Sequence, residues 1–111
     1  MVTKTEKVLA TSLNAGGLKM VLVTLTSPTL TTGAETITLN TLRRIENFHA
    51  TVEVSTETDD YVKRHSIAAG SGENQLAVSV EKMQVSATNT WGAALTADCA
   101  GDVISVIAFG Y

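Results

Sequence analysis

The alternation of apolar and polar side chains across residues 46–54 constrains the fold of this chain more than any other sequence feature. Phe48, Ala50, Val52 and Val54 alternate with polar residues, which is the period of a strand with one buried and one solvated face. Shorter patterns of the same kind recur along the chain, and none carries the i, i+3, i+4 apolar stripe of a helix. We expect strands at residues 6–13, 18–26, 36–39, 46–54, 61–69, 75–85 and 102–111.

Turn chemistry separates these segments and sets the fold class. Asn14-Ala15-Gly16-Gly17 predicts a hairpin turn, residues 68–74 predict an exposed turn, and the break in parity at Ile45 predicts a bulge or a change of sheet. We therefore predict an all-β fold of about seven mostly antiparallel strands in a sandwich or small barrel, without substantial helix. Residues 1–111 form one β domain, in which residues 1–7 are either a flexible N-terminal arm or a frayed terminus.

The composition indicates an unusually neutral surface. The 17 Thr and 8 Ser outnumber the 8 basic and 11 acidic residues, and the net charge is −3. With no basic cluster longer than Arg43-Arg44 or Lys63-Arg64, we expect no nucleic-acid partner. The longest apolar stretches fall short of the roughly 20 residues that span a bilayer, so no membrane partner is expected. The N-terminus lacks a secretory pattern, which favours a protein kept in a cytoplasm or released with something assembled there.

Candidate chemical groups are few, and we assign no catalytic, cofactor-binding or metal-binding residue. His49 and His65 lie on different expected strands without further ligands, so we interpret both as surface histidines, exposed or hydrogen-bonded. The single Cys99 cannot form an internal disulfide and is expected to be a small buried hydrophobe. Residues 70–72 lack the strand-to-helix setting of a nucleophile turn. The acidic segment 53–60 lacks the spacing of a calcium loop, which favours a solvated turn.

Two expected strands, 18–26 and 102–111, are apolar on both faces, although a simple sandwich buries only one face of each strand. Either they are the central pair of a closed barrel, or an identical subunit covers the second face. Burial of roughly four aliphatic side chains is worth on the order of 6–12 kcal/mol before association costs, which favours a homo-oligomer. The residues assigned to this interface are Leu18, Met20, Leu22, Val103, Ile104, Val106, Phe109 and Tyr111.

Five patterns follow one another between residues 36 and 111. They are Thr36-Ile37-Thr38-Leu39, Ile45-Glu46-Asn47-Phe48, residues 74–82, Thr90-Trp91-Gly92 and the apolar run 103–111, which ends in Gly110-Tyr111. In this order, and in its apolar last strand followed by Gly and one final residue, the chain resembles small structural proteins of tailed viruses. The resemblance implies a β-sandwich or barrel that decorates or cements a capsid, or belongs to a tail or connector, usually as a symmetric oligomer.

From the resemblance we expect a non-enzymatic virion structural protein, foremost a capsid decoration or cement protein. Its partners would be copies of itself, with a trimer favoured, and capsid or tail proteins; its location would be the virion, after assembly in the host cytoplasm. The alternative is a carbohydrate-binding or adhesion β-sandwich module with Trp91, and either Tyr61 or Tyr111, on an exposed platform. A small enzyme is the third interpretation, but no constellation of residues supports it, and no cofactor is expected.

Overall fold

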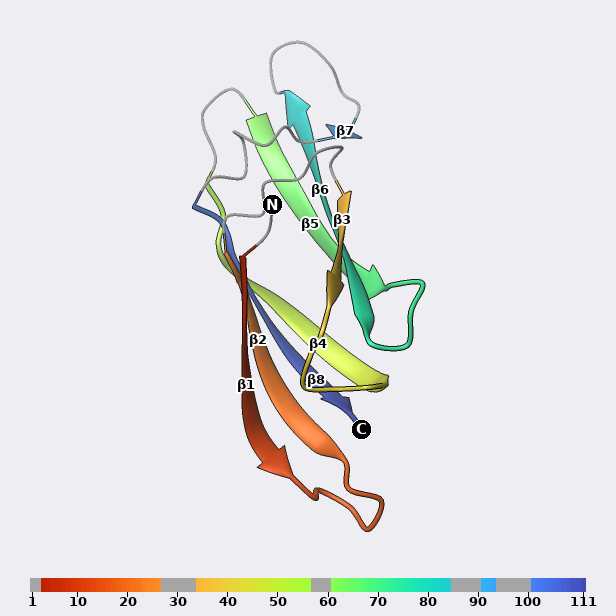
Figure 1. Ribbon diagram of the computed structural model, residues 1–111. Coiled ribbons are helices and arrows are strands. Elements are labelled where there is room, and N and C mark those ends of the chain that lie inside the picture. Colours follow the sequence, from red (N-terminus) through yellow and green to blue (C-terminus); the bar gives the residue numbers. More distant parts are fainter. Residues whose placement is uncertain (1–2, 27–33, 57–60, 85–90, 94–100) are drawn as a thin grey trace.

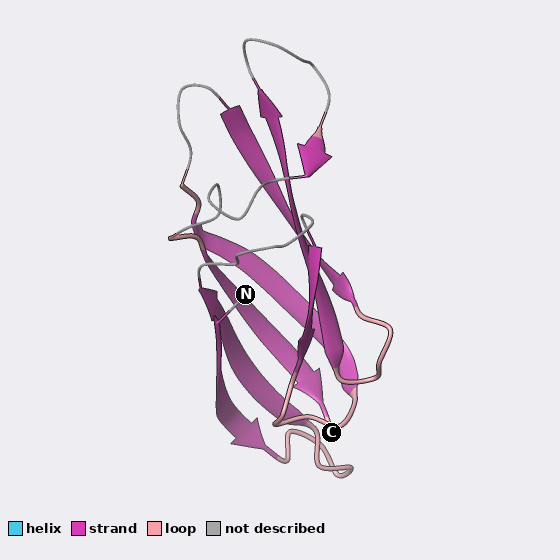
Figure 2. Cartoon of the chain, turned by 45° about the horizontal axis from the view of Figure 1, so that its top comes forward, coloured by secondary structure: helices cyan, strands magenta, loops and turns pink. Residues whose placement is uncertain are grey.

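The computed structural model describes residues 3–26, 34–56, 61–84, 91–93 and 101–111, and it confirms the all-β prediction. Two separate antiparallel sheets pack together as a small sandwich (Figures 1 and 2). The strands are β1 (Thr3–Thr11), β2 (Lys19–Thr26), β3 (Ala34–Thr38), β4 (Ile45–Val54), β5 (Tyr61–Ala69), β6 (Gln75–Gln84), β7 (Gly92–Ala93) and β8 (Val103–Gly110). Sheet A has the order β1-β2-β8-β4, and sheet B has the order β3-β6-β5, with β7 also paired to β6.

The core lies between the inward faces of the two sheets. In sheet A, every second residue of the central strands β2 and β8 is buried, which is the result of the two-residue period of a strand. Strand β6, the centre of sheet B, supplies the opposing layer. The fully buried side chains from these three strands are Val21, Val23, Leu25, Ile104, Val106, Ala108, Leu76, Val78 and Val80. The long apolar run 103–110 is thus the middle of a sheet and is covered on one face within the chain.

The N-terminal hairpin confirms the predicted turn but corrects the predicted arm. Asn14 Oδ1 accepts hydrogen bonds from the backbone N–H groups of Gly16 and Leu18, and Gly17 adopts a φ of +84° that favours glycine. Residues 3–7, however, belong to β1 and pair with β2 from Thr3 opposite Thr26 onward. The mixed polarity of this segment did not predict a strand, because one of its inward-facing residues is the carboxylate Glu6. Its hydrogen-bond partners lie in the connection between β3 and β4. Residues 1 and 2 lie outside the described residues.

Register shifts mark both edges of sheet A. In β4 the pairing with β8 slips between Ile45 and Asn47, as the parity break in the sequence predicted, and again between Val52 and Val54. In β1 the pairing with β2 slips between Val8 and Ala10.

The C-terminus is fastened to the segment that precedes β4. The backbone N–H groups of Arg43 and Arg44 donate to the carbonyl oxygen of Tyr111, at 2.6 and 3.1 Å, and the Tyr111 N–H donates to the Arg44 carbonyl at 2.9 Å. The Arg44 guanidinium lies 5.1 Å from the centroid of the Tyr111 ring. Gly110 is buried at this point, and a Cβ there would collide with the carbonyl oxygen of Arg44. The close approach of two backbones explains a glycine at the end of β8.

We expect Gly110→Ala to lower the free energy of unfolding by about 2 kcal/mol or more, because the collision is with backbone and forces β8 away from β4. Urea denaturation followed by circular dichroism measures the change. Gly92→Ala is the matched control, since nothing lies within 4 Å of a Cβ at Gly92. Equal stability of both variants would contradict the close approach.

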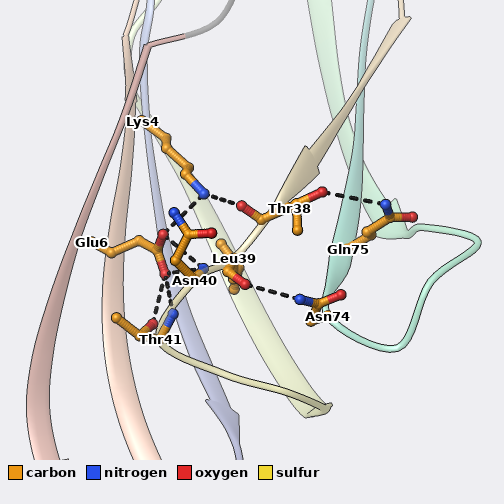
Figure 3. A network of polar contacts seen from close by, with 8 residues as sticks. All are labelled: Lys4, Glu6, Thr38, Leu39, Asn40, Thr41, Asn74 and Gln75. Carbon is orange, nitrogen blue, oxygen red and sulfur yellow. Dashed lines mark hydrogen bonds and ion pairs between the residues drawn. The ribbon is translucent and has the colours of Figure 1, made fainter.

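A carboxylate clasp joins β1 of sheet A to the connection between β3 and β4 (Figure 3). The Glu6 side chain is 8% exposed and accepts hydrogen bonds from the backbone N–H groups of Asn40 and Thr41, each at 3.0 Å, and from the Thr41 hydroxyl at 2.6 Å. The Lys4 ammonium lies 3.0 Å from the carboxylate and also donates to the Thr38 carbonyl. The clasp thus secures the edge strand β1 across the opening between the sheets.

These contacts set the charge state of Glu6. Burial alone raises the pKa of the carboxyl group, but the Thr41 hydroxyl, the two backbone N–H groups and Lys4 outweigh it and lower the pKa from 4.5 to about 2. A lowered pKa means that the stabilisation is fully present above pH 4.5 and is lost as the pH falls through about 2.

We expect Glu6→Gln to remove up to about 3 kcal/mol of stability at neutral pH, because the neutral amide replaces the charged acceptor. The deficit should shrink as the pH falls from 4.5 toward 2, where the wild-type carboxylate is itself protonated. Urea denaturation at several pH values measures both effects. Glu53→Gln, at an exposed position of β4, is the control and should change stability little. A deficit that does not vary with pH would contradict the role of the charge.

Candidate functional site: an outer apolar face and a buried charge cluster

The outer face of sheet A carries a contiguous group of apolar side chains. Met20 lies opposite Phe109, and Leu22 lies opposite Ile107, so that four large side chains form a block on the two central strands. All four are half-buried by their neighbours in the sheet, and no other part of the described chain forms a layer over them. We call these four residues the apolar block.

Polar residues border most of the apolar block, and Ala10 of β1 lies opposite Met20. On the β1 side, Lys7 is opposite Leu22, and on the β4 side, Asn47 and His49 are opposite Phe109 and Ile107. In the next row along the strands, Thr24 is opposite Ser105. An apolar centre with a polar rim is the usual anatomy of a protein interface. Isolated apolar residues are ordinary on a surface, whereas four adjacent half-buried ones on two paired strands make this face a candidate binding surface.

The predicted interface residues lie in three different parts of the structure: the outer face of sheet A, the core, and the segments that follow the first hairpin turn and β8. Met20, Leu22, Val103 and Phe109 lie on the outer face of sheet A, as the alternation in the sequence requires. Ile104 and Val106 are 0% exposed and belong to the core, so their assignment to an interface was wrong.

The two ends of the predicted interface have other surroundings. Leu18 is half-buried and precedes β2, and its carbonyl accepts the N–H groups of Ser12 and Leu13. Tyr111 is held by Arg44, and its hydroxyl accepts a 3.2 Å hydrogen bond from Asn14. Ile107 was omitted from the prediction, although its parity with Phe109 places it in the apolar block.

A second notable group is a cluster of charged side chains buried between the sheets. Asp102, immediately before β8, accepts hydrogen bonds from Lys63 Nζ to both carboxylate oxygens at 2.8 Å. His65 Nε2 lies 2.8 Å from Asp102 Oδ2. The Thr56 backbone N–H and hydroxyl both donate to Asp102 Oδ1, at 2.8 and 2.9 Å. The side chains of Lys63 and Asp102 are 0% exposed, and that of His65 is 4% exposed.

The cluster holds Asp102 in its charged form. Burial alone raises the pKa of the Asp102 carboxyl, but the hydrogen bonds from Lys63, Thr56 and His65 outweigh it and lower the pKa below 3.8. A carboxylate can only accept hydrogen bonds, so His65 Nε2 carries the hydrogen that it shares with Oδ2. Among the described residues, no buried side-chain nitrogen or oxygen lacks a hydrogen-bond partner.

The sequence did not predict this cluster. His65 was interpreted as a surface histidine but is almost fully buried, because its position in β5 has the same parity as Ile67 and points between the sheets. Lys63 shares that parity, and Asp102 is separated from Lys63 by 39 positions. The sequence did contain one signal, since Lys63 and His65 are two titratable residues at inward-facing positions of the same strand. Their partner, Asp102, could be identified only from the tertiary fold.

Comparison with protein-family models, with curated proteins and with solved structures finds no match to this chain. A function for the chain therefore has to be inferred from the geometry of its own residues.

The other residues considered from the sequence do not form a catalytic or metal-binding group within the described ranges. In the part of the chain that the structure describes, no three His, Cys, Asp or Glu side chains gather to hold a metal ion. Among the same residues, no helix has the length and apolar character needed to cross a membrane. The Arg64 guanidinium covers the half-buried Trp91 ring at 4.4 Å from its centroid. Cys99 and residues 57–60 lie outside the described residues, whereas His49 is exposed on β4, as predicted.

An open depression of about 370 Å³ lies between the start of β4 and the turn joining β5 and β6. Its lining includes Asn47, Phe48, Gly70, Gly72 and Glu73. The turn itself is closed by hydrogen bonds within residues 70–75, as expected for a hairpin connection. None of these groups forms a nucleophile-and-base pair, so we assign no reaction to the depression.

Proposed function

We propose that this chain is a non-enzymatic virion structural protein of the capsid decoration or cement type, which works as a homo-oligomer. The observation that carries the proposal is the apolar block on the outer face of sheet A. Its position in the middle of a rigid four-stranded sheet, with Lys7, Asn47 and His49 at its rim, suits a specific contact between preformed surfaces. The virion assignment is supported by the resemblance of the strand order to small structural proteins of tailed viruses.

In the proposed mechanism, identical subunits related by symmetry bury the apolar block of each subunit. Side chains of the apolar block lose their remaining contact with water when another copy covers them, and each contributes in proportion to the area removed from water. A trimer is the proposed state, with capsid or tail proteins as further partners. The low charge of the surface is consistent with this role, since charged residues are depleted at the centres of interfaces.

The assembly is tested by light scattering coupled to size-exclusion chromatography at micromolar concentration. We expect a discrete oligomer for the wild-type chain. Ile107→Asp places a charge in the centre of the apolar block and should raise the dissociation constant at least about 100-fold, or about 3 kcal/mol, because the carboxylate must lose its hydration. The fold should persist, since the half-buried position remains open to water in the free subunit.

Thr51→Asp is the control for that experiment. Thr51 is exposed on the same face of sheet A but lies on the edge strand β4, outside the apolar block. It should leave the oligomer intact. A wild-type chain that stays monomeric at high concentration would contradict the proposed assembly. Proteomic analysis of purified virus particles from the source that encodes this chain tests the virion assignment separately, and its absence from such particles would count against that assignment.

A further inference from the structure

The buried cluster brings a primary amine against a carboxyl group, and both of these side chains are 0% exposed. Lys63 comes from β5 in sheet B, and Asp102 immediately precedes β8 in sheet A, so the contact links the two sheets. We propose that Lys63 and Asp102 condense within the folded chain into a side-chain amide, an isopeptide bond, and that Thr56 and His65 assist the reaction. The cluster is then a single-turnover, autocatalytic cross-linking site.

The groups around the Asp102 carboxylate are those that acyl transfer uses: a nitrogen nucleophile, two donors to one oxygen and one donor to the other. The nucleophile, Lys63 Nζ, is 2.8 Å from both carboxylate oxygens. Oδ1 receives two donors, the Thr56 backbone N–H at 2.8 Å and the Thr56 hydroxyl at 2.9 Å, which is the arrangement that stabilises an oxyanion. Oδ2 accepts a hydrogen bond from His65 Nε2 at 2.8 Å, so a donor lies beside the oxygen that must depart.

The reaction balances without a co-reactant. The Lys63 ammonium first gives one proton to Asp102 Oδ2, which leaves a neutral amine and a neutral carboxyl group. The nitrogen lone pair then forms a bond to Cγ, and the carbonyl electron pair moves onto Oδ1, where the two Thr56 donors hold it. The second proton passes from Nζ directly to Oδ2, which lies 2.8 Å away, while the N–H of His65 Nε2 donates a hydrogen bond to the same oxygen. The Cγ–Oδ2 bond breaks, Oδ2 leaves as water, the Nζ–Cγ amide remains, and no atom is oxidised or reduced.

Burial of the ion pair favours this condensation and acts against the hydrogen bonds that stabilise the Asp102 carboxylate. In water, hydration holds an amine and a carboxyl group as separate ions, whereas the side chains of Lys63 and Asp102 are both 0% exposed. A buried ion pair recovers its desolvation penalty only in part, and an uncharged group of similar shape is often as stable or more stable in its place. The amide carries no charge, so the reaction removes both buried ions. Burial of the two linked side chains then protects the bond from hydrolysis.

The experiment is mass spectrometry of the denatured wild-type chain, first intact and then after digestion with trypsin. Condensation lowers the intact mass by one water molecule. Trypsin cannot cleave after an acylated lysine, so the linked chain should yield residues 45–64 joined to residues 83–111 as one branched species. The unlinked chain should instead yield residues 45–63 and 83–111 as separate peptides. Fragmentation of the branched species locates the bond at Lys63 and Asp102.

Variants identify the roles of the four residues. Lys63→Met and Asp102→Ala should each restore the full mass, whereas Lys7→Met, which removes an exposed lysine of β1, should retain the loss of water. Thr56→Val and His65→Gln should slow the appearance of the branched species at least tenfold in freshly translated protein. Masses are read on unfolded chains, and the wild-type digest decides the proposal even where a variant folds poorly. Full intact mass and only separate peptides after prolonged incubation at neutral and mildly alkaline pH would overturn it, as would a loss of water without the branched species.

Discussion

Val106→Asp is expected to unfold the chain. Val106 is 0% exposed at the centre of β8, where it packs in the core between the two sheets. An aspartate there would have to bury its charge or its unpaired polar atoms, and neither the neighbouring valines nor the leucines can donate a hydrogen bond. We expect a loss of about 5 kcal/mol or more, which equals or exceeds the whole stability of many domains of this size.

Thermal unfolding followed by circular dichroism measures this effect, and the neighbouring residue provides the control. Ile107→Asp changes the next side chain along β8, which points to the opposite face of sheet A. The first variant should lose its cooperative transition, and the second should keep it while losing assembly. If both variants melted as the wild type does, the assignment of inward and outward faces in β8 would be falsified.

Asp102→Ala has the second-largest expected effect, a loss of about 3–5 kcal/mol, because removal of one partner leaves the Lys63 ammonium buried without a counter-charge. The dependence of the free energy of unfolding on pH should also change in the acidic range. The pKa of Asp102 is lowered from 3.8, so its contribution in the ion-paired form is fully present above pH 3.8 and is lost as the pH falls through the folded pKa. Urea denaturation of the variant and of wild-type protein that retains its full mass, across acidic and neutral pH, measures both.

The next residue along β5 supplies a matched control for the buried pair. Arg64 pairs with Glu81 at 3.0 Å, but both of these side chains are about half exposed. Glu81→Ala should therefore cost less than about 1 kcal/mol, as is usual for ion pairs on a surface. Similar losses for Asp102→Ala and Glu81→Ala would contradict the burial of the Lys63 and Asp102 side chains.

The sequence predicted the positions of strands where apolar and polar residues alternate clearly or where an apolar run marks a central strand. The alternation in residues 46–54 and the apolar runs on either side of it predicted β4, β2 and β8, because burial of one face or of a central strand determines the pattern. Turn residues such as Gly17 fixed the first hairpin. The start of β1 was missed because Glu6 faces inward, and a carboxylate at an inward position is explained only by its hydrogen bonds to Asn40 and Thr41.

The two site features differ in how far the sequence could predict them. Alternation along β8 places Ile104 and Val106 on one face and Phe109 on the other. The sequence was therefore sufficient to keep the first two residues out of the predicted interface. The buried cluster was not predictable in the same way. Its members come from β5 and from the residues next to β4 and β8, and the contact between them exists only once the two sheets have packed.

The register shifts at the margins of sheet A bear on how the protein can grow into larger structures. An outermost strand offers unpaired backbone groups to which a foreign strand can add without limit, and irregular pairing and lysine side chains on such a strand oppose that addition. Strand β1 has a shift between Val8 and Ala10 together with Lys4 and Lys7, and β4 has a shift near each end. Polymerisation along the hydrogen-bonding direction is therefore disfavoured. Contacts that bury the broad side of the sheet remain available, and these can close after a fixed number of copies, where an open ladder would extend into a fibre.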